Sequence, residues 1–558
     1  MRFRTCPAVK KYKDFGGELT LHGIRLFSVG QADLFSSTLR ILLPAAEITN
    51  VSSPEEANVR ISVSHAFSPQ SEYCLMRITD TGVEIHCRDN AGARNAAAVA
   101  AQLASPVPGG FTLPCGMIED WPDAAYRAMM LESSGRAWMP MEHLMRHIRE
   151  MALARMNVLQ FHFMEHNGCT VPLECLPEFP GYGSENLKYT REEIDRMIGY
   201  AASLGITVTP FVEILSHATS LAKCAGITCP GDTEENMFAV CVGQEKTFSV
   251  IREVLAEIAA IFPDDIIHIG ADEYDMSAVT PYTAHWDKCP ECRRLAAEKG
   301  FTTLRELFVY AIGRINRIVN GLGKVMMMWN ADMRPGHLPD SLDRNIIMHF
   351  YRSDNTLCRE KIFDLSIGGY AAEGFSVINS YFPLTYMDFD FYMSAEKLSS
   401  WTHLTNPLVP AENRASVPGG CCCAWEAHGH YIRSISAAIL LFADRLWNAF
   451  GSPAVYDNEY GTVMTRILFS GALPADMNVF ACIGTVLPPL NEKTKVSVYS
   501  IAAPECELIR TEKALRVLAE KGDWLAGAYA DAVSEAGAEL RALPAEFSPQ
   551  AKPTFFIG

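Results

Sequence analysis

Short hydrophobic runs alternate with longer amphipathic segments along the chain after residue 125. Each run has the length of a buried parallel strand, and the runs cover residues 128–131, 157–163, 207–214, 266–270, 325–329, 345–350, 376–380 and 420–425. Between them, apolar residues recur with the helical period at 141–155, 191–204, 245–261, 304–320 and 433–450. Eight strands alternating with helices predict the α/β class and, within it, a (β/α)8 (TIM) barrel. A doubly wound sheet is the alternative, but no glycine-rich phosphate-binding sequence follows any of the strands.

The first 120 residues show a different pattern, which predicts a small α+β domain. Apolar and polar residues alternate over 59–64 and 73–79, and Asp80-Thr81-Gly82 then leads into a further strand at 83–87, as in a β-hairpin. An alanine-rich helix is expected at 91–104. Helical stretches near the end, at 506–520 and 524–541, carry no recognisable chemistry. The predicted domains are an N-terminal α+β companion domain (1–120), a barrel (121–450) and a mostly helical C-terminal extension (451–558), which packs on the barrel or on a second subunit of a homodimer.

The composition narrows the classes of partner. The 558 residues carry a formal net charge of −17, which argues against nucleic acid or an anionic membrane, since both favour basic surfaces. No stretch approaches the ~18 apolar residues of a membrane span, and the N-terminus lacks the apolar segment of a secretory signal. The seventeen cysteines are odd in number and scattered, which favours reduced thiols over a disulfide framework. We therefore expect a cytoplasmic protein.

Acidic, histidine and aromatic residues gather just after the predicted strands. In a (β/α)8 barrel this end of the strands carries the chemistry. The residues are Glu132, Glu165, His166, Glu213, His217, Asp272, Glu273, Trp329 to Asp332, Tyr386 to Asp388, Trp425 and Glu426. Aromatic faces stack on sugar rings and carboxylates bind sugar hydroxyls, so the set is compatible with a carbohydrate site. The plainer interpretation is that the loops at any barrel mouth are polar because they face water.

The stretch from His268 to Glu273, with the sequence HIGADE, is the most informative local feature. If the strand keeps its period of two, Gly270 and Asp272 face the barrel axis, and Gly270 leaves room beneath a ligand. Glu273 then points elsewhere, so both acids reach one site only where the strand has ended. Two neighbouring carboxylates push one pKa upward, as a general acid working near neutral pH requires. An Asp-Glu pair that caps a following helix is the alternative.

HIGADE resembles the H-x-G-[GA]-D-E motif of glycoside hydrolase family 20, the β-N-acetylhexosaminidases. The resemblance extends in the family's order from about residue 90 to residue 450, and the first 120 residues resemble the family's companion α+β domain. The other stretches that carry it are Tyr126 to Leu131 with Arg136 and Pro140, Asn157 to His162, Tyr189-Thr190 with Glu193, Gly205 to Pro210, His217, Trp286, Cys289-Pro290 with Cys292, and Ala443 to Trp447.

The resemblance implies a retaining exo-enzyme that removes terminal β-linked N-acetylglucosamine or N-acetylgalactosamine from an oligosaccharide or glycoconjugate. In this family the substrate's own acetamido oxygen attacks the anomeric carbon and forms an oxazolinium-like intermediate, so no metal, nucleotide or other cofactor is expected. By resemblance, Glu273 is the general acid and base, Asp272 orients the acetamido group, and Tyr386 hydrogen-bonds its oxygen. The other implied residues are His217 and Glu165, which hold Glu273, and Arg136, His162, Trp329, Asp388, Trp425 and Glu426, which bind or enclose the sugar.

Some positions depart from the family's pattern behind the acid pair. Glu165-His166 stand where the family has paired aspartates, although Glu165 can still pair with His217. Glu213 replaces the aspartate that is usual after the third strand. Asp272, Glu273 and Tyr386 nevertheless match the family's pattern. The part of the site that binds the acetamido group is therefore expected to be intact.

Other departures affect the part of the site that reads the sugar hydroxyls. An extra residue near Gly135 precedes Arg136, and Phe350 or Tyr351 could substitute for a pocket tryptophan that is not evident. Glu426 comes one position earlier than the glutamate of the family's W-x-E motif, and such a shift turns a side chain to the other face. Two alternatives therefore remain: a sugar-binding protein that has lost catalysis, and a hydrolase for a modified hexosaminide, either 6-sulfated or unacetylated.

The remaining histidine and cysteine pairs are assigned no metal. His143 and His147 have the spacing of two zinc ligands on a helix but lack the H-E-x-x-H sequence. Cys289 and Cys292 form a single C-x-x-C, which three other cysteines could complete in principle: Cys224, Cys229 and Cys241. Residues expected to have core or structural roles are Arg127, Met326 to Met328 and Cys421 to Cys423.

Overall fold

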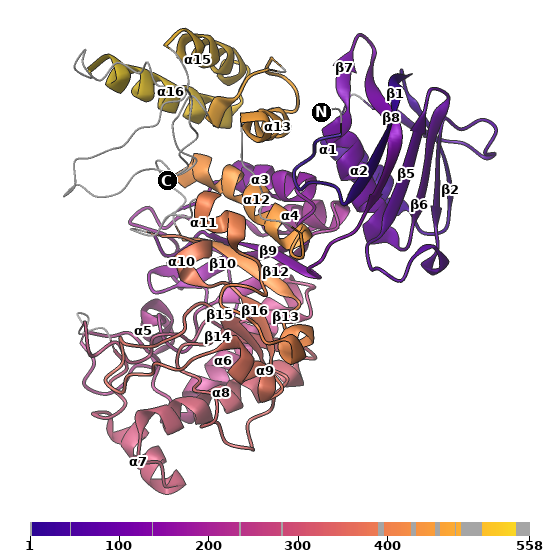
Figure 1. Ribbon diagram of the computed structural model, residues 1–558. Helices are drawn as coiled ribbons and strands as arrows, with labels where there is room; N and C mark the ends of the chain where they lie inside the picture. The colour runs from indigo at the N-terminus through magenta and orange to yellow at the C-terminus, as the bar shows by residue number, and fades with distance from the viewer. Residues whose placement is uncertain are drawn as a thin grey trace.

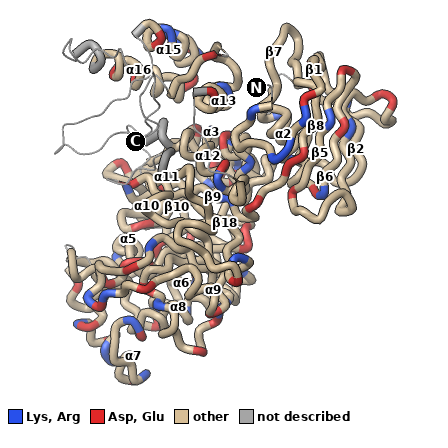
Figure 2. Tube along the Cα trace, in the orientation of Figure 1, with Lys and Arg blue, Asp and Glu red and all other residues tan. Residues whose placement is uncertain are grey.

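The computed structural model describes residues 3–44, 46–136, 138–233, 236–280, 283–388, 395–425, 431–451, 458–474, 476–480 and 505–542. Figure 1 shows a sheet domain on the right, a barrel at the lower left, and C-terminal helices above the barrel. Within these ranges no helix combines the length and the hydropathy of a membrane span. In Figure 2, acidic and basic residues are interspersed along the sheet and the barrel, so the acidic excess is not confined to one segment.

The N-terminal domain is one mixed sheet with two helices. Its elements are β1 (Lys11–Leu21), β2 (Ile24–Val29), α1 (Asp33–Leu42), β3 (Ile48–Asn50), β4 (Val59–Val63), η1 (His65–Phe67), β5 (Cys74–Thr79), β6 (Gly82–Cys87), α2 (Asn90–Leu103), β7 (Ser105–Val107) and β8 (Gly110–Asp120). The strand order is β1-β8-β5-β6-β4-β2-β3, with β7 paired to β8. Both helices lie between the sheet and the barrel (Figure 1). The predicted strands β4, β5 and β6 and the predicted helix α2 are present.

Eight parallel strands form the barrel, as the sequence predicts. They are β9 (Tyr126–Glu132), β10 (Val158–Glu165), β12 (Thr207–Val212), β13 (Ile266–His268), β14 (Val325–Trp329), β15 (Ile347–Phe350), β16 (Ser376–Asn379) and β18 (Gly419–Ala424). β9 pairs with both β10 and β18, which closes the barrel. Two short strands extend it, β11 (Gly168–Cys169) on β10 and β17 (Tyr386–Met387) on β18. The α/β class and the (β/α)8 architecture are therefore confirmed.

Helices surround the barrel and continue into the C-terminal extension. They are α3 (Met141–Leu153), α4 (Arg191–Ser203), α5 (Thr219–Ala225), α6 (Glu245–Ile261), α7 (Pro290–Lys299), α8 (Leu304–Gly321), α9 (Ile367–Ala372), α10 (Phe382–Thr385), α11 (Ala395–Ser400), η2 (Ala411–Ser416), α12 (Tyr431–Trp447), α13 (Asn458–Leu468), α15 (Glu505–Ala519) and α16 (Trp524–Ala542). All seven helices predicted after residue 120 are present, with ends that differ by a few residues.

Side chains of the barrel strands alternate between an outer and an inner core. In β14, Met326 and Met328 pack outward against the helices, whereas Met327 fills the barrel interior. In β18 the outward residue is Cys422, and its two neighbours, Cys421 and Cys423, point inward. These methionines and cysteines are core residues, as predicted.

Two buried arginines join the sheet domain to the barrel. Arg94 of α2 donates hydrogen bonds to the carbonyl oxygens of Met156 (2.6 Å) and Arg155 (3.2 Å), which follow α3. Arg127 of β9 forms a bidentate ion pair with Glu72, with N···O distances of 3.0 and 2.7 Å. Arg127 is structural, as expected, because its guanidinium is fully buried at the junction of the two domains.

The C-terminal helices pack on α3 of the barrel. Trp524 of α16 stacks on His143, with 3.8 Å between ring centroids. Asp523 accepts a hydrogen bond from Arg146 at 2.8 Å, and His147 hydrogen-bonds Glu150 through Nδ1 at 2.9 Å. The His147 ring also contacts the edge of Trp524, with 6.0 Å between ring centroids. Both histidines with zinc-like spacing therefore take part in the packing of the extension on the barrel.

Candidate active site

A cavity of about 190 Å³ opens at the carboxyl ends of the barrel strands. Its lining contains most of the site residues predicted from the sequence, together with several residues that were not predicted. The lining residues are Glu132, Arg136, Glu165, Glu213, His217, Asp272, Glu273, Tyr351, Arg352, Leu357, Phe382, Tyr386, Asp388 and Trp425.

The chain after β13 turns sharply, and this turn delivers both acids to the cavity. β13 ends at His268, and Gly270, Ala271 and Glu273 then have φ angles of 64°, 66° and 54°. This left-handed region is uncommon for residues other than glycine, so successive side chains no longer alternate as they do in a strand. Asp272 and Glu273 consequently line the same cavity. The expectation that both acids share a site only where the strand has ended is confirmed.

Glu213 supports this turn from below. Its Oε2 accepts a hydrogen bond from the backbone N–H of Ala271 at 3.0 Å. A Cβ atom on Gly270 would lie 1.8 Å from the same oxygen, so the turn tolerates only glycine there. Burial, with the nearby Asp272 carboxylate, raises the pKa of Glu213 well above its usual value. This shift favours the neutral form of the Glu213 carboxyl, which supports the turn that carries the acid pair.

His217 connects two glutamates in a chain that ends at Glu273. Its Nδ1 lies 2.9 Å from Glu165 Oε1, and its Nε2 lies 3.5 Å from Glu273 Oε2. Burial disfavours the charged imidazolium, but Asp272 and the two glutamates outweigh that effect and raise the pKa of His217 well above its usual value. The two carboxylates on either side of the ring therefore favour the protonated form of His217.

The two neighbouring acids have pKa values shifted in opposite directions. Burial raises the pKa of Asp272 to about 7, with a further increase from the charge of Glu273 and an opposing effect of His217. Burial also acts on Glu273, but the hydrogen bond and charge of His217, together with the charge of Arg352, outweigh it and lower the pKa of Glu273. In this structure the raised pKa of the pair thus belongs to Asp272.

Tyr351 and Arg352, which follow β15, complete the surroundings of Glu273. Arg352 was not predicted from the sequence as a site residue. The hydroxyl of Tyr351 donates to Glu273 Oε1 at 3.5 Å, and an Arg352 N–H donates to the same oxygen at 3.4 Å. The Tyr351 ring also stacks with that of Tyr386, with centroids 6.3 Å apart. Their position directly after a barrel strand is the signal that could have identified them.

The opposite side of the cavity combines a cation, an acid and an indole ring. Arg136 forms an ion pair with Asp388, and its guanidinium lies over the Trp425 ring, 5.7 Å from the centroid. The loop before Arg136 is held by Glu132, which accepts hydrogen bonds from the backbone N–H groups of Ser134 and Gly135. The extra residue near Gly135 therefore does not prevent Arg136 from reaching the cavity.

Two residues that the sequence predicted to bind the sugar lie beneath the cavity and do not line it. His162 is fully buried, and its Nδ1 lies 3.1 Å from Glu132 Oε2. Trp329 is also buried, with its ring centroid 6.2 Å from that of Tyr386 and 6.1 Å from that of Trp425. In this structure both support lining residues from below. Glu426 lies outside the described residues, so its role in binding remains a prediction.

The sequence model described as "Glycosyl hydrolase family 20, catalytic domain" matches residues 125–426, which is more than half of the chain. The chain belongs to glycosyl hydrolase family 20. The matched segment contains the eight barrel strands and the described residues that line the cavity.

Several proteins named beta-hexosaminidase resemble more than half of the chain. "Beta-hexosaminidase" of Vibrio furnissii is 26% identical over 391 residues, covering 63% of this chain and 60% of that protein. "Beta-hexosaminidase 3" of Arabidopsis thaliana is 25% identical over 355 residues, covering 62% of this chain and 61% of that protein. The chain thus spans about 60% of the length of these relatives.

Solved structures share the fold at lower identity. The β-N-acetylhexosaminidase of Bacteroides fragilis superimposes with a TM-score of 0.70 at 23% identity, covering 83% of this chain and 95% of that one. A family 20 exo-β-N-acetylglucosaminidase of Vibrio harveyi, in complex with N-acetylglucosamine, gives a TM-score of 0.69 at 19% identity, with coverage of 85% and 77%.

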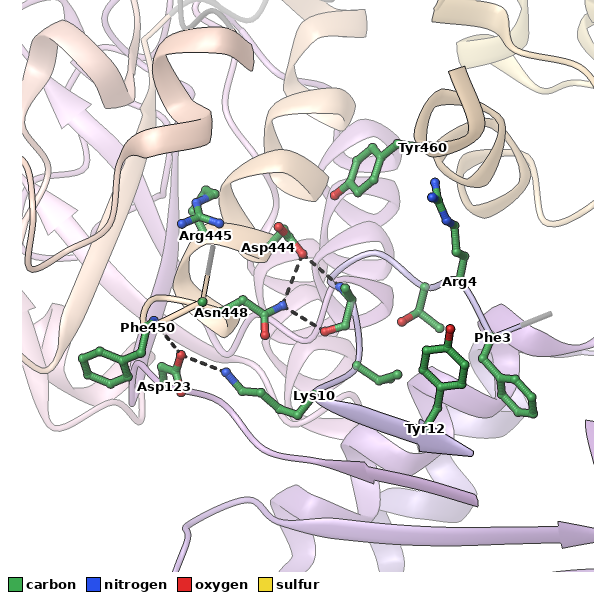
Figure 3. A pocket seen from close by; sticks show the side chains of 14 residues that line it. Phe3, Arg4, Lys10, Tyr12, Asp123, Asp444, Arg445, Asn448, Phe450 and Tyr460 are labelled. Carbon is green, nitrogen blue, oxygen red and sulfur yellow. Dashed lines mark hydrogen bonds and ion pairs between the residues drawn. The ribbon is translucent and has the colours of Figure 1, made fainter. Parts of the chain in front are cut away.

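A second, larger cavity of about 600 Å³ lies away from the barrel mouth of this family 20 chain. Figure 3 shows it between the N-terminal segment and α12. Lys10 pairs there with Asp123 at 2.8 Å, and Asp444 accepts a hydrogen bond from the Ala8 N–H at 2.9 Å. These polar groups bind each other across the domain junction and do not converge on a ligand. We therefore interpret the cavity as a gap at the interface between domains.

Proposed function

We propose that the chain is a retaining exo-β-N-acetylhexosaminidase that removes terminal β-linked N-acetylglucosamine or N-acetylgalactosamine. The observation that carries this proposal is the turn after β13, which brings Asp272 and Glu273 into one cavity with Tyr386. Membership of family 20 and the names of the relatives support the same activity. The small cavity at the end of the barrel suits one terminal sugar residue.

In the proposed first step the substrate supplies the nucleophile. The acetamido oxygen attacks the anomeric carbon, the bond to the leaving oxygen breaks, and an oxazolinium ion forms. Tyr386 donates its O–H to the acetamido oxygen and thereby positions it. Asp272, in its ionised form, accepts the acetamido N–H and stabilises the positive charge that develops on the ring.

The proton for the leaving group comes from Glu273, which we propose is loaded by His217. His217 Nε2 lies 3.5 Å from Glu273 Oε2, so a proton on this nitrogen would be next to the carboxylate. A sugar bound in the cavity displaces water from Glu273, which disfavours its charged form and moves that proton onto it. Glu273 then passes the proton to the leaving oxygen. In the second step Glu273 takes a proton from the water that attacks the anomeric carbon.

Replacing Glu273 by Gln tests this function. The amide cannot donate the proton, so turnover of a chromogenic β-N-acetylglucosaminide is expected to fall by about 10²- to 10⁴-fold. Glu192→Gln is the matched control, because Glu192 is exposed in the first turn of α4 and does not line the cavity. Near-normal turnover by Glu273→Gln, with the control unchanged, would refute the assignment.

A substrate with an anionic substituent is the second candidate, and Arg352 favours it. Arg136 and Arg352 both line the cavity, and guanidinium groups bind sulfate and carboxylate well. A panel of aryl β-hexosaminides that varies the epimer, the N-acetyl group and the 6-substituent separates the candidates. Faster cleavage of a 6-sulfated member than of the plain N-acetyl sugar would favour the modified substrate. Sugar binding in calorimetry without cleavage of any member would favour a binding protein.

A further inference from the structure

Four buried cysteine sulfurs converge at one point beside the barrel mouth. The Sγ–Sγ distances are 3.6 Å for Cys241–Cys289, 3.7 Å for Cys241–Cys292 and 3.9 Å for Cys229–Cys292. All four sulfurs lie within 4.8 Å of one another. Four sulfurs placed tetrahedrally at ~2.3 Å from a zinc ion are about 3.8 Å apart. A disulfide requires about 2.05 Å, so the observed spacing matches ligands that share one ion.

The four ligands come as two pairs from distant parts of the sequence. Cys229 and Cys241 belong to the loop between α5 and α6, whereas Cys289 precedes α7 and Cys292 lies in its first turn. The partially positive N-terminus of a helix favours thiolate over thiol. Of the three cysteines that could complete the C-x-x-C site, the fold brings Cys229 and Cys241 to it, whereas Cys224 is not in the cluster.

Surrounding contacts hold the two loops against each other. A Cβ atom on Gly243 would lie 2.4 Å from the Cys292 nitrogen, so the first loop approaches the first turn of α7 closely. Trp286 donates its indole N–H to the Val240 carbonyl at 2.9 Å. Thr247 donates to the carbonyl of Cys241 at 2.6 Å. The sulfur positions are thus built into the packing of both loops, as bound metal ligands usually are.

We propose that Cys229, Cys241, Cys289 and Cys292 bind one structural zinc ion. Four thiol protons leave as the ion binds, which gives a tetrahedral zinc-tetrathiolate with a net charge of −2. No ligand position stays open for water or substrate, so the ion stabilises structure and does not take part in the reaction. Soft thiolate ligands select zinc over calcium or magnesium. The thiolates also require a reducing environment, in line with the proposed cytoplasmic location.

The site would connect the two loops that carry the acid machinery. Cys229 and Cys241 lie in the connection from β12 to α6, which also contains His217 and α5. Cys289 lies in the connection from β13 to α7, which also contains Asp272 and Glu273. A zinc ion between these loops would maintain the distance between His217 and Glu273 from outside the cavity. The metal proposal itself rests on the sulfur positions and is independent of the proposed activity.

Metal content is the first test. The full chain, produced with zinc and purified with a thiol reductant, is expected to contain about one zinc per chain by inductively coupled plasma mass spectrometry. Cys241→Ser is expected to lose the ion, and Cys175→Ser, which changes a cysteine outside the cluster, is expected to keep it. Absence of zinc from the wild-type chain, or equal zinc in Cys241→Ser, would overturn the proposal.

Cobalt substitution provides a readout that needs no variant. Wild-type protein stripped of metal and reloaded with Co²⁺ is expected to show thiolate-to-cobalt charge transfer and the visible bands of a tetrahedral tetrathiolate site. A mercurial reagent that blocks thiols is expected to release the bound zinc, as detected with a chromogenic chelator. An octahedral cobalt spectrum, iron as the native metal, or a Cys–Cys disulfide in the freshly purified reduced protein would each overturn the zinc assignment.

Discussion

Burial and the charges of neighbouring residues together set the pKa of each acid in the cavity. Asp272 has a buried Oδ1 without a hydrogen-bond partner among the described residues, and burial raises its pKa to about 7. Glu273 lies beside His217 and Arg352, whose positive charges outweigh burial and lower its pKa. The sequence indicates two adjacent carboxylates, but it does not indicate which of the two has the raised pKa and which the lowered one.

Arg352 is expected to tune the pH dependence of the reaction. Glu273 must carry a proton to act as an acid, and the Arg352 cation disfavours that protonated form. Arg352→Met therefore raises the pKa of Glu273 and moves the basic limb of kcat/KM to higher pH. Arg352→Lys keeps the charge and should leave the limb near its wild-type position. Measured pH profiles with the same basic limb for all three proteins would contradict this role.

Among the elements, the eight barrel strands were predictable from their apolar runs, whereas the exposed strand β1 was not. Strand β1 shows why, since nine of its eleven residues are exposed and only Leu19 and Leu21 are buried. The hydrophobic signal of a strand is absent there, although β1 pairs with β8 along its length. The barrel strands are buried along nearly all of their length, so their apolar runs are clear in the sequence.

The turn after β13 is expected to depend on Gly270. Gly270→Ala places a side chain at a φ of 64° and against the Glu213 carboxyl, which costs about 1–3 kcal/mol from backbone strain alone. Displacing Asp272 and Glu273 should also reduce turnover by about 10²-fold. Gly199→Ala in α4 is the control, because a Cβ there has nothing within 4 Å. Thermal unfolding and steady-state kinetics of both variants check this expectation, and equal behaviour of the two would contradict it.

At the scale of the whole molecule, sequence patterns predicted the barrel and its acid motif but not the groups that long-range packing brings together. Arg352 reaches Glu273 across 79 residues of chain, and Cys241 meets Cys289 across 48. Local periodicity carries no information on such pairs. The order of short motifs along the barrel did carry information on the family, because a barrel places the end of each strand at the same mouth.

The central claim is that the cavity holds the substrate's acetamido group as the nucleophile, with Asp272 and Tyr386 as its partners. A thiazoline that mimics the cyclic intermediate tests this claim directly by isothermal titration calorimetry. Since such analogues use the interactions of the transition state, Asp272→Ala should bind the thiazoline at least ~10²-fold more weakly than the wild-type chain, and Glu192→Gln should bind it normally. Equal affinity of Asp272→Ala and the wild-type chain would contradict the claim.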